Sequence, residues 1–309
     1  MISIVIPLYN KEKQVANTLQ SVFNQTFQDF EVVIVNDGST DKSVEEVEKF
    51  NNPRICLIHQ KNAGVSAARN KGIAETKYDY IALLDADDEW YPDYLQEQVN
   101  LINKYPECSI FVCAYEFRNH KGELKPIIVN KMPFSSQTGV LTNYFEVASC
   151  SHPPICSINI VAQKESFLSI GGFPVGVQSG EDLLTWARLA TKYSIAYSRR
   201  VLSVFNLGSS QSYENAPSRV PEKDDYVGME LERLYKKNKT IVGLKKYVAL
   251  WFKMRASQFL LLGNKKHTLK EASKSLKYNL FNMRVWSYIL LLLFPKSFRY
   301  KVFQTLGSQ

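Results

Sequence analysis

The first 117 residues alternate short runs of β-type residues with segments of helical periodicity, and this alternation strongly restricts the possible folds. Strands are expected at Ile2–Pro7, Phe30–Asn36, Ile55–Gln60, Tyr80–Asp85 and Ser109–Phe117. Helices are expected between them, at Lys13–Asn24, Ser43–Phe50, Val65–Glu75 and Pro92–Tyr105. Because right-handed crossovers join such strands into a largely parallel sheet, we predict an α/β fold with helices flanking the sheet. Ligands of such sheets bind beyond the carboxyl ends of the strands, so the polar residues there form the candidate site.

The remainder of the chain changes character near residue 222. Lys121–Thr138 is typical of a loop or hairpin insertion, and helices are expected at Gln163–Ile170 and Glu181–Thr191. A strand at Ile195–Phe205 follows, and from Asp224 onward only helical periodicity remains. We therefore predict an α/β domain over residues 1–222 and a C-terminal α-helical extension over residues 223–309.

Charge is unevenly distributed along a chain of otherwise ordinary composition. Of the 309 residues, 45% are apolar and 22% charged, which excludes wholesale disorder and low-complexity scaffolds. Residues 226–309 contain 17 Lys and Arg against three Asp and Glu, a net charge of +14, so the other residues carry −6 within the total of +8. This asymmetry indicates either an anionic partner for the basic tail or an ordinary solvated helical surface.

Three features bear on the cellular compartment. The five cysteines are odd in number and form no CxxC pair, which is typical of buried thiols in a reducing compartment. The first residues, MISIVIPLYN, lack the basic region of a signal peptide. The longest apolar run, Val285–Phe294, is about half of the roughly 20 residues that a membrane span needs. We expect a cytoplasmic protein.

Polar motifs follow the second and third expected strands. Asp37 stands directly after a strand, where a carboxylate can accept a hydrogen bond from a base N–H or a ribose hydroxyl. The alternative is an Asx-turn in which Asp41 caps the next helix, and the motif has room for both. The small residues of Asn62–Asn70 open a helix whose N-terminus suits a diphosphate, with Arg69 one turn in; alternatively they only allow close packing on the sheet.

Four carboxylates lie within five residues after the fourth strand, namely Asp85, Asp87, Asp88 and Glu89. Left unpaired, they would repel one another strongly. A divalent cation would relieve this repulsion, and oxygen ligands without a nearby His or Cys cluster point to Mg²⁺ or Mn²⁺ rather than Zn²⁺. A helix N-terminus at Pro92 explains one or two of these acids, but not Asp85 and Asp87.

One more pair of acids, Glu181 and Asp182, stands at the start of an expected helix. Acids in a first helical turn are ordinary, because they interact favourably with the helix dipole. A functional interpretation requires one of the two to lie in the ligand cleft, where it would act as a base.

Taken together, these segments resemble the family 2 glycosyltransferases of the GT-A fold. The resemblance covers about Met1–Asn206 and rests on motifs in family-like order: Ile4–Asn10, Asn36–Asp41, Asn62–Gly72, Leu84–Asp88, and Gly171–Phe173 followed by Glu181-Asp182. It implies a metal-dependent, inverting transfer of a sugar from a nucleotide sugar to a hydroxyl acceptor. UDP-linked hexose or N-acetylhexosamine is the favoured donor class, and assembly of a cell-surface polysaccharide or glycan is the expected setting.

The same resemblance implies a nucleotide-binding role for several motif residues. Asp37 would contact the nucleobase, and Asp85 would lie near the ribose. The residues that would line the nucleotide pocket are Pro7, Tyr9, Asp37, Arg69, Asp85 and Ala86. Asp87, the last residue of the DXD triplet, would bind the Mn²⁺ or Mg²⁺ that bridges the diphosphate.

The chemistry of sugar transfer agrees with these implied roles. The leaving group is a nucleoside diphosphate, whose developing charge a divalent cation can neutralise, so no protein acid is needed. The acceptor hydroxyl must lose a proton as it attacks the anomeric carbon from the opposite face. By the resemblance, Asp182 would be this general base and Glu181 would help to place the acceptor.

The chain departs from the family pattern in three places. Asn36-Asp37 replaces the frequent Asp-Asp pair, so only the second acid is retained. The QxxRW signature of processive synthases is absent, because Trp186 is followed by Ala187-Arg188. Many relatives carry a His after the last strand as a further metal ligand, where this chain has Phe205–Gly208. We therefore expect a water as the last ligand, or a weakly held metal.

The basic tail admits two interpretations. Its apolar residues, flanked by Lys and Arg, suit a helix in a membrane interface at the inner face of the cell membrane, where lipid-linked saccharide acceptors lie. Alternatively, the tail packs as a helical bundle on the catalytic domain or on another subunit. Nucleic-acid binding is not expected, since no base-reading motif accompanies the charge. A homodimer is compatible with the sequence, although no residue demands it.

Two other functions remain open. A nucleotidyltransferase that uses a sugar phosphate would combine a similar sheet with a carboxylate-bound metal, but Leu8–Lys13 has no glycine where such enzymes carry a Gly-rich loop. A non-catalytic nucleotide-sugar-binding protein is disfavoured, because the acidic cluster and Glu181-Asp182 are both retained. The acceptor pocket is expected in the loops Lys121–Pro154 and Gly208–Pro221.

Overall fold

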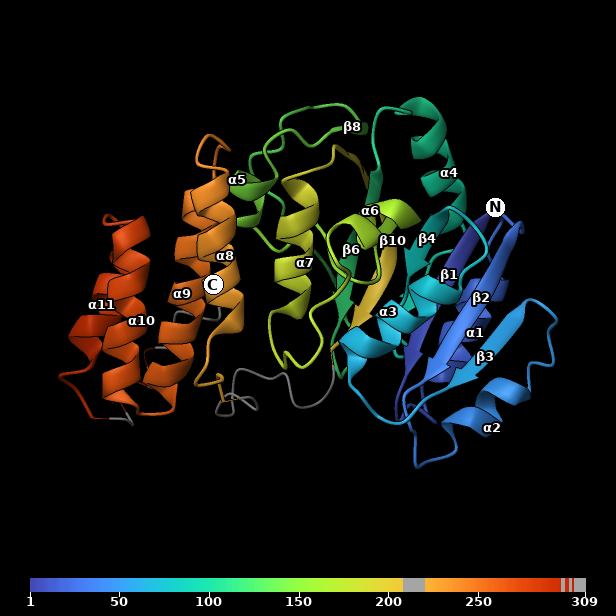
Figure 1. Ribbon diagram of the computed structural model, residues 1–309, viewed down its shortest axis with the longest axis horizontal. Coiled ribbons are helices and arrows are strands. Elements are labelled where there is room, and N and C mark those ends of the chain that lie inside the picture. The colour runs from blue at the N-terminus through green and yellow to red at the C-terminus, as the bar shows by residue number, and fades with distance from the viewer. Residues whose placement is uncertain (208–219, 296–297, 300–301, 303–309) are drawn as a thin grey trace. The chain divides into compact units, whose positions relative to one another are not determined.

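Hydrophobic strands of the first 207 residues assemble into a ten-stranded sheet (Figure 1). The computed structural model describes residues 1–207, 220–295, 298–299 and 302. The first unit comprises Met1–Val147 and Ser151–Leu207, and the second comprises Ala148–Cys150 and the residues from Gly208 onward. The predicted boundary between residues 222 and 223 falls inside the second unit, and most of the expected acceptor loop Gly208–Pro221 lies outside the described residues.

The main path of the sheet has the order β3-β2-β1-β4-β9-β6-β10-β5. These strands are β3 (Ile55–His59), β2 (Phe30–Asn36), β1 (Ile2–Leu8), β4 (Tyr80–Leu83), β9 (Ile160–Gln163), β6 (Ile110–Arg118), β10 (Ile195–Asn206) and β5 (Glu89–Trp90). The first four pair in parallel, and β9 runs antiparallel to both of its neighbours. Two short strands lie off this path: β7 (Leu124–Pro126) on β6 and β8 (Thr138–Val140) on β10. The predicted mostly parallel α/β sheet is confirmed.

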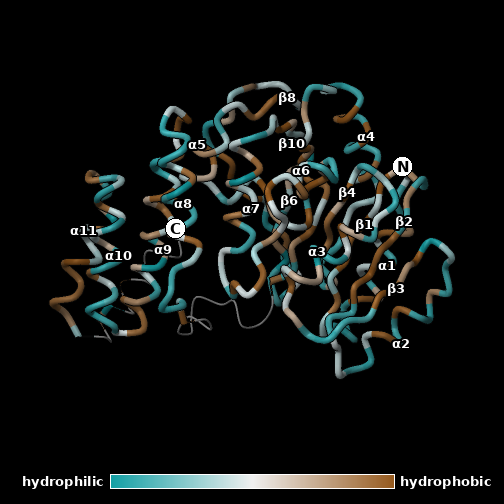
Figure 2. The backbone as a smooth tube through the Cα atoms, viewed as in Figure 1, coloured by the Kyte–Doolittle hydropathy of each residue, from teal (hydrophilic) through white to brown (hydrophobic). Residues whose placement is uncertain are grey.

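The helices of the first unit connect these strands. They are α1 (Val15–Phe23), α2 (Ser43–Glu48), α3 (Val65–Glu75), α4 (Tyr94–Lys104), α5 (Tyr144–Ala148), α6 (Lys164–Ser169) and α7 (Glu181–Ala190). The helices predicted from hydrophobic periodicity are all present, with ends that differ by a few residues at most. In Figure 2 the helices alternate between hydrophilic and hydrophobic segments, as expected for helices with one face on a core. The short elements β5, β8, α5 and β9 were not predicted.

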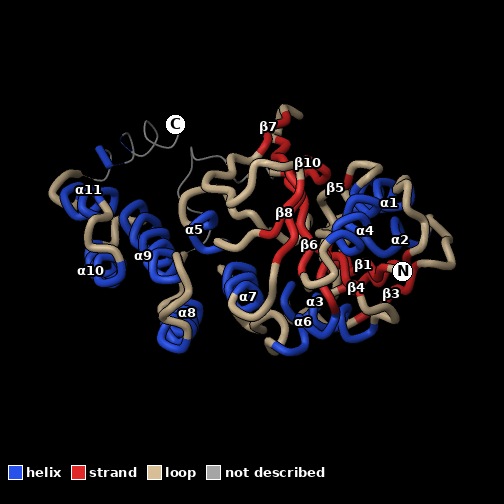
Figure 3. The backbone as a smooth tube through the Cα atoms, turned by 90° about the horizontal axis from the view of Figure 1, so that it is seen from above, coloured by secondary structure: helices blue, strands red, loops and turns tan. Residues whose placement is uncertain are grey.

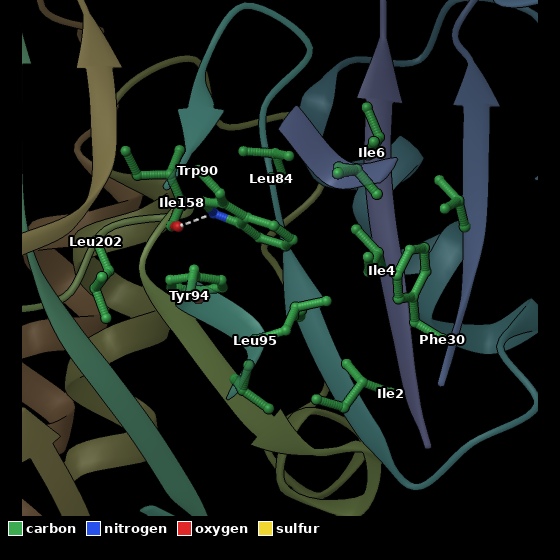
Figure 4. Packing of buried hydrophobic residues seen from close by; sticks show 14 of the residues in the cluster. Ile2, Ile4, Ile6, Phe30, Leu84, Trp90, Tyr94, Leu95, Ile158 and Leu202 are labelled. Atoms are coloured by element: carbon green, nitrogen blue, oxygen red, sulfur yellow. Dashed lines mark hydrogen bonds between the residues drawn. The ribbon is translucent and has the colours of Figure 1, made fainter. Parts of the chain in front are cut away.

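The core forms where the buried central strands meet the segment after β4. All residues of β1 except Pro7 are buried, which explains why its sequence is nearly continuously apolar rather than alternating. Figure 4 shows Ile2, Ile4 and Ile6 beside Phe30 of β2. In the same core, Trp90 stacks on Tyr94 with a centroid distance of 4.2 Å and donates from Nε1 to the carbonyl of Ile158 at 2.6 Å.

Helix α3 packs unusually close to the sheet. An added Cβ at Gly72 would lie 2.4 Å from Cγ1 of Val5, so no larger residue fits there without displacing β1. The small residues of this helix therefore serve close helix–sheet packing, which was one of the two interpretations of the motif. This packing also brings Arg69, on the preceding turn, to the edge of the sheet where β1 and β4 end.

The second unit is a helical bundle of α8 (Tyr226–Lys237), α9 (Leu244–Leu261), α10 (Lys265–Tyr278) and α11 (Met283–Leu291). Figure 3 shows the last three side by side. Buried Arg255 lies 3.3 Å from Asp225 and 3.5 Å from Glu271, and Trp251 also donates to Asp225 at 3.0 Å. Among the helices of the described residues, none has the length and apolar character needed to cross a bilayer.

None of the five cysteines forms a disulfide bond. Cys108, Cys113 and Cys156 are buried in the first unit, as predicted. Cys56 and Cys150 are exposed, so the expectation that the thiols are buried is wrong for these two.

Candidate functional site

The candidate site begins where β1, β2 and β4 end together. Leu8 is paired with Asn36 in the register of β1 and β2, and Asp37 N donates to the carbonyl of Leu8 at 2.8 Å. On the other side of β1, Leu84 N donates to the carbonyl of Val5 at 3.1 Å. The chain after β4 therefore stays hydrogen-bonded to β1 for one residue beyond Leu83, the last residue of β4 that pairs with β1. Parallel pairing thus brings the polar residues after these strands to one edge of the sheet.

Asp37 is buried and organises the segment that leads into α3. Its carboxylate accepts hydrogen bonds from Gln60 Nε2 at 2.7 Å, Ala63 N at 2.9 Å and Gly64 N at 2.8 Å. Two of the amides expected to face a diphosphate are therefore already bound to Asp37. Since each carboxylate oxygen can accept more than one hydrogen bond, Asp37 retains acceptor capacity for a ligand.

Asp41 ties the β1–α1 connection to the start of α2. Its carboxylate accepts from Ser43 N at 3.0 Å and from Glu12 N at 3.1 Å. Burial alone would raise the pKa of Asp41, but the hydrogen bonds from Ser43 and Glu12 outweigh it and lower the pKa. Asp41 thus satisfies a backbone donor at the start of α2, as expected, although the residue directly before the helix is Lys42.

Arg69 is the buried cation of the site. It is 4% exposed, and Nη2 donates to Asp85 Oδ1 at 2.7 Å. Its guanidinium lies over the ring of Phe173, 5.1 Å from the centroid. Nε and Nη1 are buried without a hydrogen-bond partner among the described residues. Buried N–H donors of this kind normally have an acceptor, so the arrangement is suited to an oxygen-rich ligand.

Asp85 is a stable anion. Its second oxygen accepts from Ser157 Oγ at 2.6 Å. Burial alone would raise the pKa of Asp85, but the Arg69 charge, the Ser157 hydrogen bond and the Lys11 charge hold it below its usual range. Asp85 is therefore ionised at neutral pH and can accept hydrogen bonds from ligand hydroxyls.

The other three acids of the cluster each have a partner within the chain. Asp87 forms an ion pair with Lys11 Nζ at 2.5 Å, and Glu89 pairs with Arg118 Nη1 at 2.6 Å. Asp88 is buried and accepts from the backbone N–H of Asn206 at 2.7 Å. These partners relieve part of the repulsion that unpaired acids would show, and the metal at Asp87 stays a prediction.

The pKa of Asp88 reflects its position in this cluster. Burial and the charges of Asp85 and Asp87 raise the pKa of Asp88 well above its usual value, against the opposing effect of the Asn206 N–H. Asn206 also donates from Nδ2 to the carbonyl of Asp87 at 2.6 Å. Asn206, at the end of β10, thus holds the acidic segment through two hydrogen bonds.

The donor set at Asp87 fits a divalent ion that arrives with its substrate. The described residues contain no group of three or more His, Cys, Asp or Glu side chains arranged to hold a metal. Mg²⁺-type ions are commonly held by one or two carboxylates together with substrate phosphates and water, rather than by an all-protein cage. The partly exposed Asp87 carboxylate, which already attracts the Lys11 ammonium, meets that requirement as a single protein ligand.

Glu181 and Asp182 occupy the first turn of α7, directly after Gly180 at φ +83°. Burial and the charge of Asp85 raise the pKa of Asp182, against the opposing effects of the Leu183 N–H and Arg69. In return, the charges of Asp85, Asp182 and Glu181 raise the pKa of Arg69, although burial alone would lower it. The acids of α7 and the acid after β4 therefore lie within electrostatic reach of the same guanidinium.

The Gly171-Gly172-Phe173 motif positions α7 relative to α3. Asn70 Nδ2 donates to the carbonyl of Phe173 at 2.8 Å, and Phe173 N donates to Asn70 Oδ1 at 2.8 Å. An added Cβ at Gly172, where φ is +69°, would lie 2.5 Å from Asn70 Oδ1. The Phe173 ring meets Trp186 of α7 edge-on at 5.6 Å. One amide side chain thus connects the helix that carries Arg69 to the helix that carries Asp182.

Three further predicted residues lie along the same strand ends. Pro7 pairs with Val35 in the register of β1 and β2. Tyr9 is 47% exposed after the end of β1, and Ala86 is buried between Asp85 and Asp87. Their contacts with a nucleotide remain predictions.

Sequence reasoning missed Lys11, Arg118, Ser157 and Asn206. Lys11 directly follows the Ile4–Asn10 motif, so a search for cations near the acidic cluster could have found it. Asn206 stands at the end of the last strand, where the expected His is lacking. For Ser157, the sequence carried no signal, because the short strand β9 and the segment before it were not predicted.

Solved structures with the same architecture define the class of the fold. Residues 1–349 of S. aureus TarS, in complex with UDP-GlcNAc, match with a TM-score of 0.68 and 17% identity over 93% of this chain and 83% of that one. The mannosyltransferase PcManGT from Pyrobaculum calidifontis, in complex with GDP-Man and Mn²⁺, matches with a TM-score of 0.59 and 15% identity over 100% and 88% of the chains. The protein has the GT-A glycosyltransferase fold.

The sequence comparisons agree with this fold. Residues 3–152 match the model of glycosyl transferase family 2. An uncharacterised glycosyltransferase of Rickettsia prowazekii is 25% identical over 243 residues, which are 78% of this chain and 75% of the relative. The family match covers just under half of the chain, and it confirms the resemblance to the family 2 glycosyltransferases seen in the motifs.

Proposed function

We propose that this protein is an inverting glycosyltransferase that moves a sugar from a nucleotide sugar to a hydroxyl acceptor. The observation that supports it most directly is the position of Arg69, which pairs with Asp85 and lies within electrostatic reach of Asp182 and Glu181. A nucleotide-binding acid and a base-type acid thus flank one buried cation. The nucleotide sugars bound to TarS and PcManGT add support from the fold.

The donor nucleotide binds along the ends of β1, β2 and β4. Asp37 accepts from the base, and Pro7, Tyr9 and Ala86 line the pocket. Asp85, ionised at neutral pH, accepts from the ribose hydroxyls. The two unpartnered N–H groups of Arg69 donate to oxygens of the nucleotide, which removes the cost of leaving them buried and unbonded.

Asp87 binds a divalent cation, Mn²⁺ or Mg²⁺, together with the diphosphate. When bound, this ion supplies positive charge that stabilises the leaving nucleoside diphosphate. The chain contributes the Asp87 carboxylate, and Lys11 must release or share that carboxylate. Lys11, whose ammonium pairs with Asp87, would add a second positive charge near a diphosphate bound there.

Asp182 removes the proton from the acceptor hydroxyl. Its Oδ1 accepts from Leu183 N at 2.7 Å, and the carboxylate keeps lone pairs that can take the proton. As the hydroxyl oxygen forms a bond to the anomeric carbon, the bond from that carbon to the diphosphate oxygen breaks on the opposite face. This single displacement inverts the anomeric centre, and a raised pKa makes Asp182 a better proton acceptor. Glu181 places the acceptor.

The donor class that we favour is a UDP-linked hexose or N-acetylhexosamine, and the acceptor is a saccharide or a lipid-linked saccharide in surface glycan assembly. TarS is bound to UDP-GlcNAc, whereas PcManGT is bound to GDP-Man, so both bases belong in a screen. The QxxRW signature is absent, which argues for addition of single sugars rather than extrusion of a polymer.

A donor screen tests the proposal. Purified protein is incubated with UDP- and GDP-sugars, Mn²⁺ or Mg²⁺ and a panel of saccharide acceptors, and the released nucleotide is measured. We expect nucleoside diphosphate release that is lost in Asp182→Asn and Asp87→Ala, and retained in Asp29→Asn, an exposed acid outside the site. Release of pyrophosphate from a sugar phosphate and a nucleoside triphosphate would instead identify a nucleotidyltransferase. Donor binding without turnover on any acceptor would favour the non-catalytic alternative.

A further inference from the structure

Helix α11 of the second unit is apolar on two opposite sides. Val285 and Leu291 are buried, and Val285 packs with Ala256 of α9 and Ala272 of α10. The opposite side also carries large apolar residues, yet it is exposed. We define the α11 apolar face by these exposed residues: Leu280, Phe281, Met283, Trp286, Leu290, Leu293 and Phe294. A soluble surface helix normally has polar residues there.

The α11 apolar face is continuous. Met283, Trp286 and Leu290 recur at spacings of three and four residues, which places them on one side of the helix. The segment before the helix is tied to this side, because Trp286 Nε1 donates to the carbonyl of Leu280 at 2.9 Å. Phe281 is 86% exposed and Leu293 79% exposed. Exposed apolar patches of this kind mark surfaces that bind another molecule or a membrane.

The sequence around this face is rich in positive charge. Residues 265–295 contain six Lys and Arg and a single acid, Glu271, which is buried beside Arg255. Neither Arg284 of α11 nor Lys253 of α9 forms an ion pair with a described residue. Burial, helped by the Arg284 charge, lowers the pKa of Lys253. These cations therefore have no neutralising acid among the described residues, and an anionic surface would supply the missing opposite charge.

We propose that the α11 apolar face docks the protein on the surface of an anionic phospholipid bilayer. A half-exposed tryptophan, aliphatic and aromatic neighbours and flanking cations are the combination that binds at the boundary between headgroups and acyl chains. Lys and Arg close to the face add attraction to anionic lipids. This peripheral contact needs no spanning helix, and it does not depend on the proposed sugar transfer.

Trp286 provides an intrinsic reporter for the test. The other three tryptophans, Trp90, Trp186 and Trp251, are at most 6% exposed, so a bilayer-borne quencher reaches Trp286 first. The full chain is mixed with vesicles of phosphatidylglycerol and phosphatidylcholine whose acyl chains carry bromine, and with vesicles of brominated phosphatidylcholine alone. We expect quenching and co-sedimentation with the anionic vesicles, much weaker binding to the neutral ones, and weaker binding at high salt.

Matched variants separate docking from nonspecific adsorption. The double variant Leu290→Asp with Leu293→Asp places charge in the α11 apolar face, and Val242→Asp places it at an exposed valine of the same unit outside the face. We expect the double variant to bind anionic vesicles at least about tenfold more weakly than the wild type, since each lost apolar insertion changes affinity by roughly that factor. Val242→Asp should bind like the wild type.

Three results would overturn the proposal. One is equal binding of the double variant and the wild type, which would indicate adsorption through charge alone. Another is the absence of Trp286 quenching with anionic vesicles. The third is a concentration-dependent dimer, seen by light scattering without lipid and abolished in the double variant, because the face would then be an interface between copies of the chain. Far-ultraviolet circular dichroism and melting curves verify that the variants are folded.

Discussion

Arg69 donates to Asp85 at 2.7 Å, yet two of its other N–H groups are buried without a partner among the described residues. Neutralising Asp85 requires only one of these donors. The burial of the other two nitrogens without an acceptor is costly, and a pairing with Asp85 alone does not explain it. Arg69 therefore has hydrogen-bond donors left over that Asp85 does not use.

Replacing Arg69 tests this spare capacity. Arg69→Lys keeps the positive charge beside Asp85 but loses the planar fork of donors. We expect nucleotide affinity to fall about 10- to 100-fold, measured by calorimetry with UDP and UDP-sugars, because one to two charge-assisted hydrogen bonds are lost. Arg54→Lys, at a partly buried arginine whose hydrogen bonds go to Gln28 rather than to the acids of the site, is the control and should bind like the wild type. Unchanged affinity in Arg69→Lys would remove Arg69 from the nucleotide pocket.

Lys11 is expected to compete with a divalent cation for Asp87. Lys11→Met removes the ammonium while keeping the length of the side chain, so Mn²⁺ should bind the nucleotide-free protein more tightly, by about tenfold. The measurement is a Mn²⁺ titration followed by electron paramagnetic resonance. Lys71→Met, which breaks only the exposed pair with Glu75, is the matched control. Weaker Mn²⁺ binding in Lys11→Met would contradict the competition.

The pH dependence of turnover tests the role of Asp182. Because burial and the Asp85 charge raise its pKa, Asp182 gains its proton at a higher pH than an ordinary aspartate does. A general base must be deprotonated, so kcat should fall as the pH drops through this raised pKa. We expect an acidic limb above the usual aspartate range, with kcat at least about 100-fold lower in Asp182→Asn. An acidic limb that persists unchanged in a residually active Asp182→Asn enzyme would assign it to another group.

The raised pKa of Asp182 also has a consequence for stability. A carboxyl that binds its proton more tightly in the folded than in the unfolded state stabilises the fold at pH values below its unfolded pKa. That contribution is lost as the pH rises through the folded pKa. In Asp182→Asn, the pH dependence of stability that comes from this carboxyl should disappear. The wild type should therefore lose stability relative to the variant as the pH rises, so the free energy of unfolding of the variant minus that of the wild type should increase with pH. Urea denaturation between pH 4 and pH 8, set as about the span of a shifted aspartate, provides the measurement.

Gly172 and Gly171 form a matched pair for testing the contact between α3 and α7. Both have positive φ, +69° and +78°, so alanine is strained at either position by about 1 kcal/mol. Only at Gly172 would the new Cβ meet Asn70 Oδ1, at 2.5 Å, whereas nothing lies within 4 Å at Gly171. We expect Gly172→Ala to lower the free energy of unfolding by about 1–3 kcal/mol more than Gly171→Ala. Equal losses would show that Asn70 moves aside without cost.

The part of the fold that sequence predicted best is the part governed by local periodicity. Phe30–Asn36 and Val65–Glu75 have the predicted bounds, because an apolar run and a helical repeat specify them directly. The four-residue strand β9 was missed, since its position between β4 and β6 depends on pairing partners distant in sequence. The two-residue strand β5 was missed for the same reason.

The sequence predicted which acids form the candidate site, but it did not predict which residues pair with them. Asp85 and Asp87 stand at the expected strand end, whereas their cations come from α3 and from the segment after β1. Sequence spacing carries no information on such long-range pairs, so the repulsion among the acids was considered without the cations that pair with them. The hydrogen bonds from Ala63 N and Gly64 N to Asp37 could not be predicted for the same reason.

The two hydrogen bonds between Asn70 and Phe173 have a consequence for how such an enzyme can diversify. Phe173 begins a stretch that ends at Gly180, and α7 starts immediately after it. Insertions or substitutions within that stretch leave the Asn70 anchor and the donor side of the site in place while they alter what surrounds Glu181. Under the proposed roles, acceptor preference would change by exchanging a few residues of this one connection, while the proposed nucleotide-binding residues stay the same.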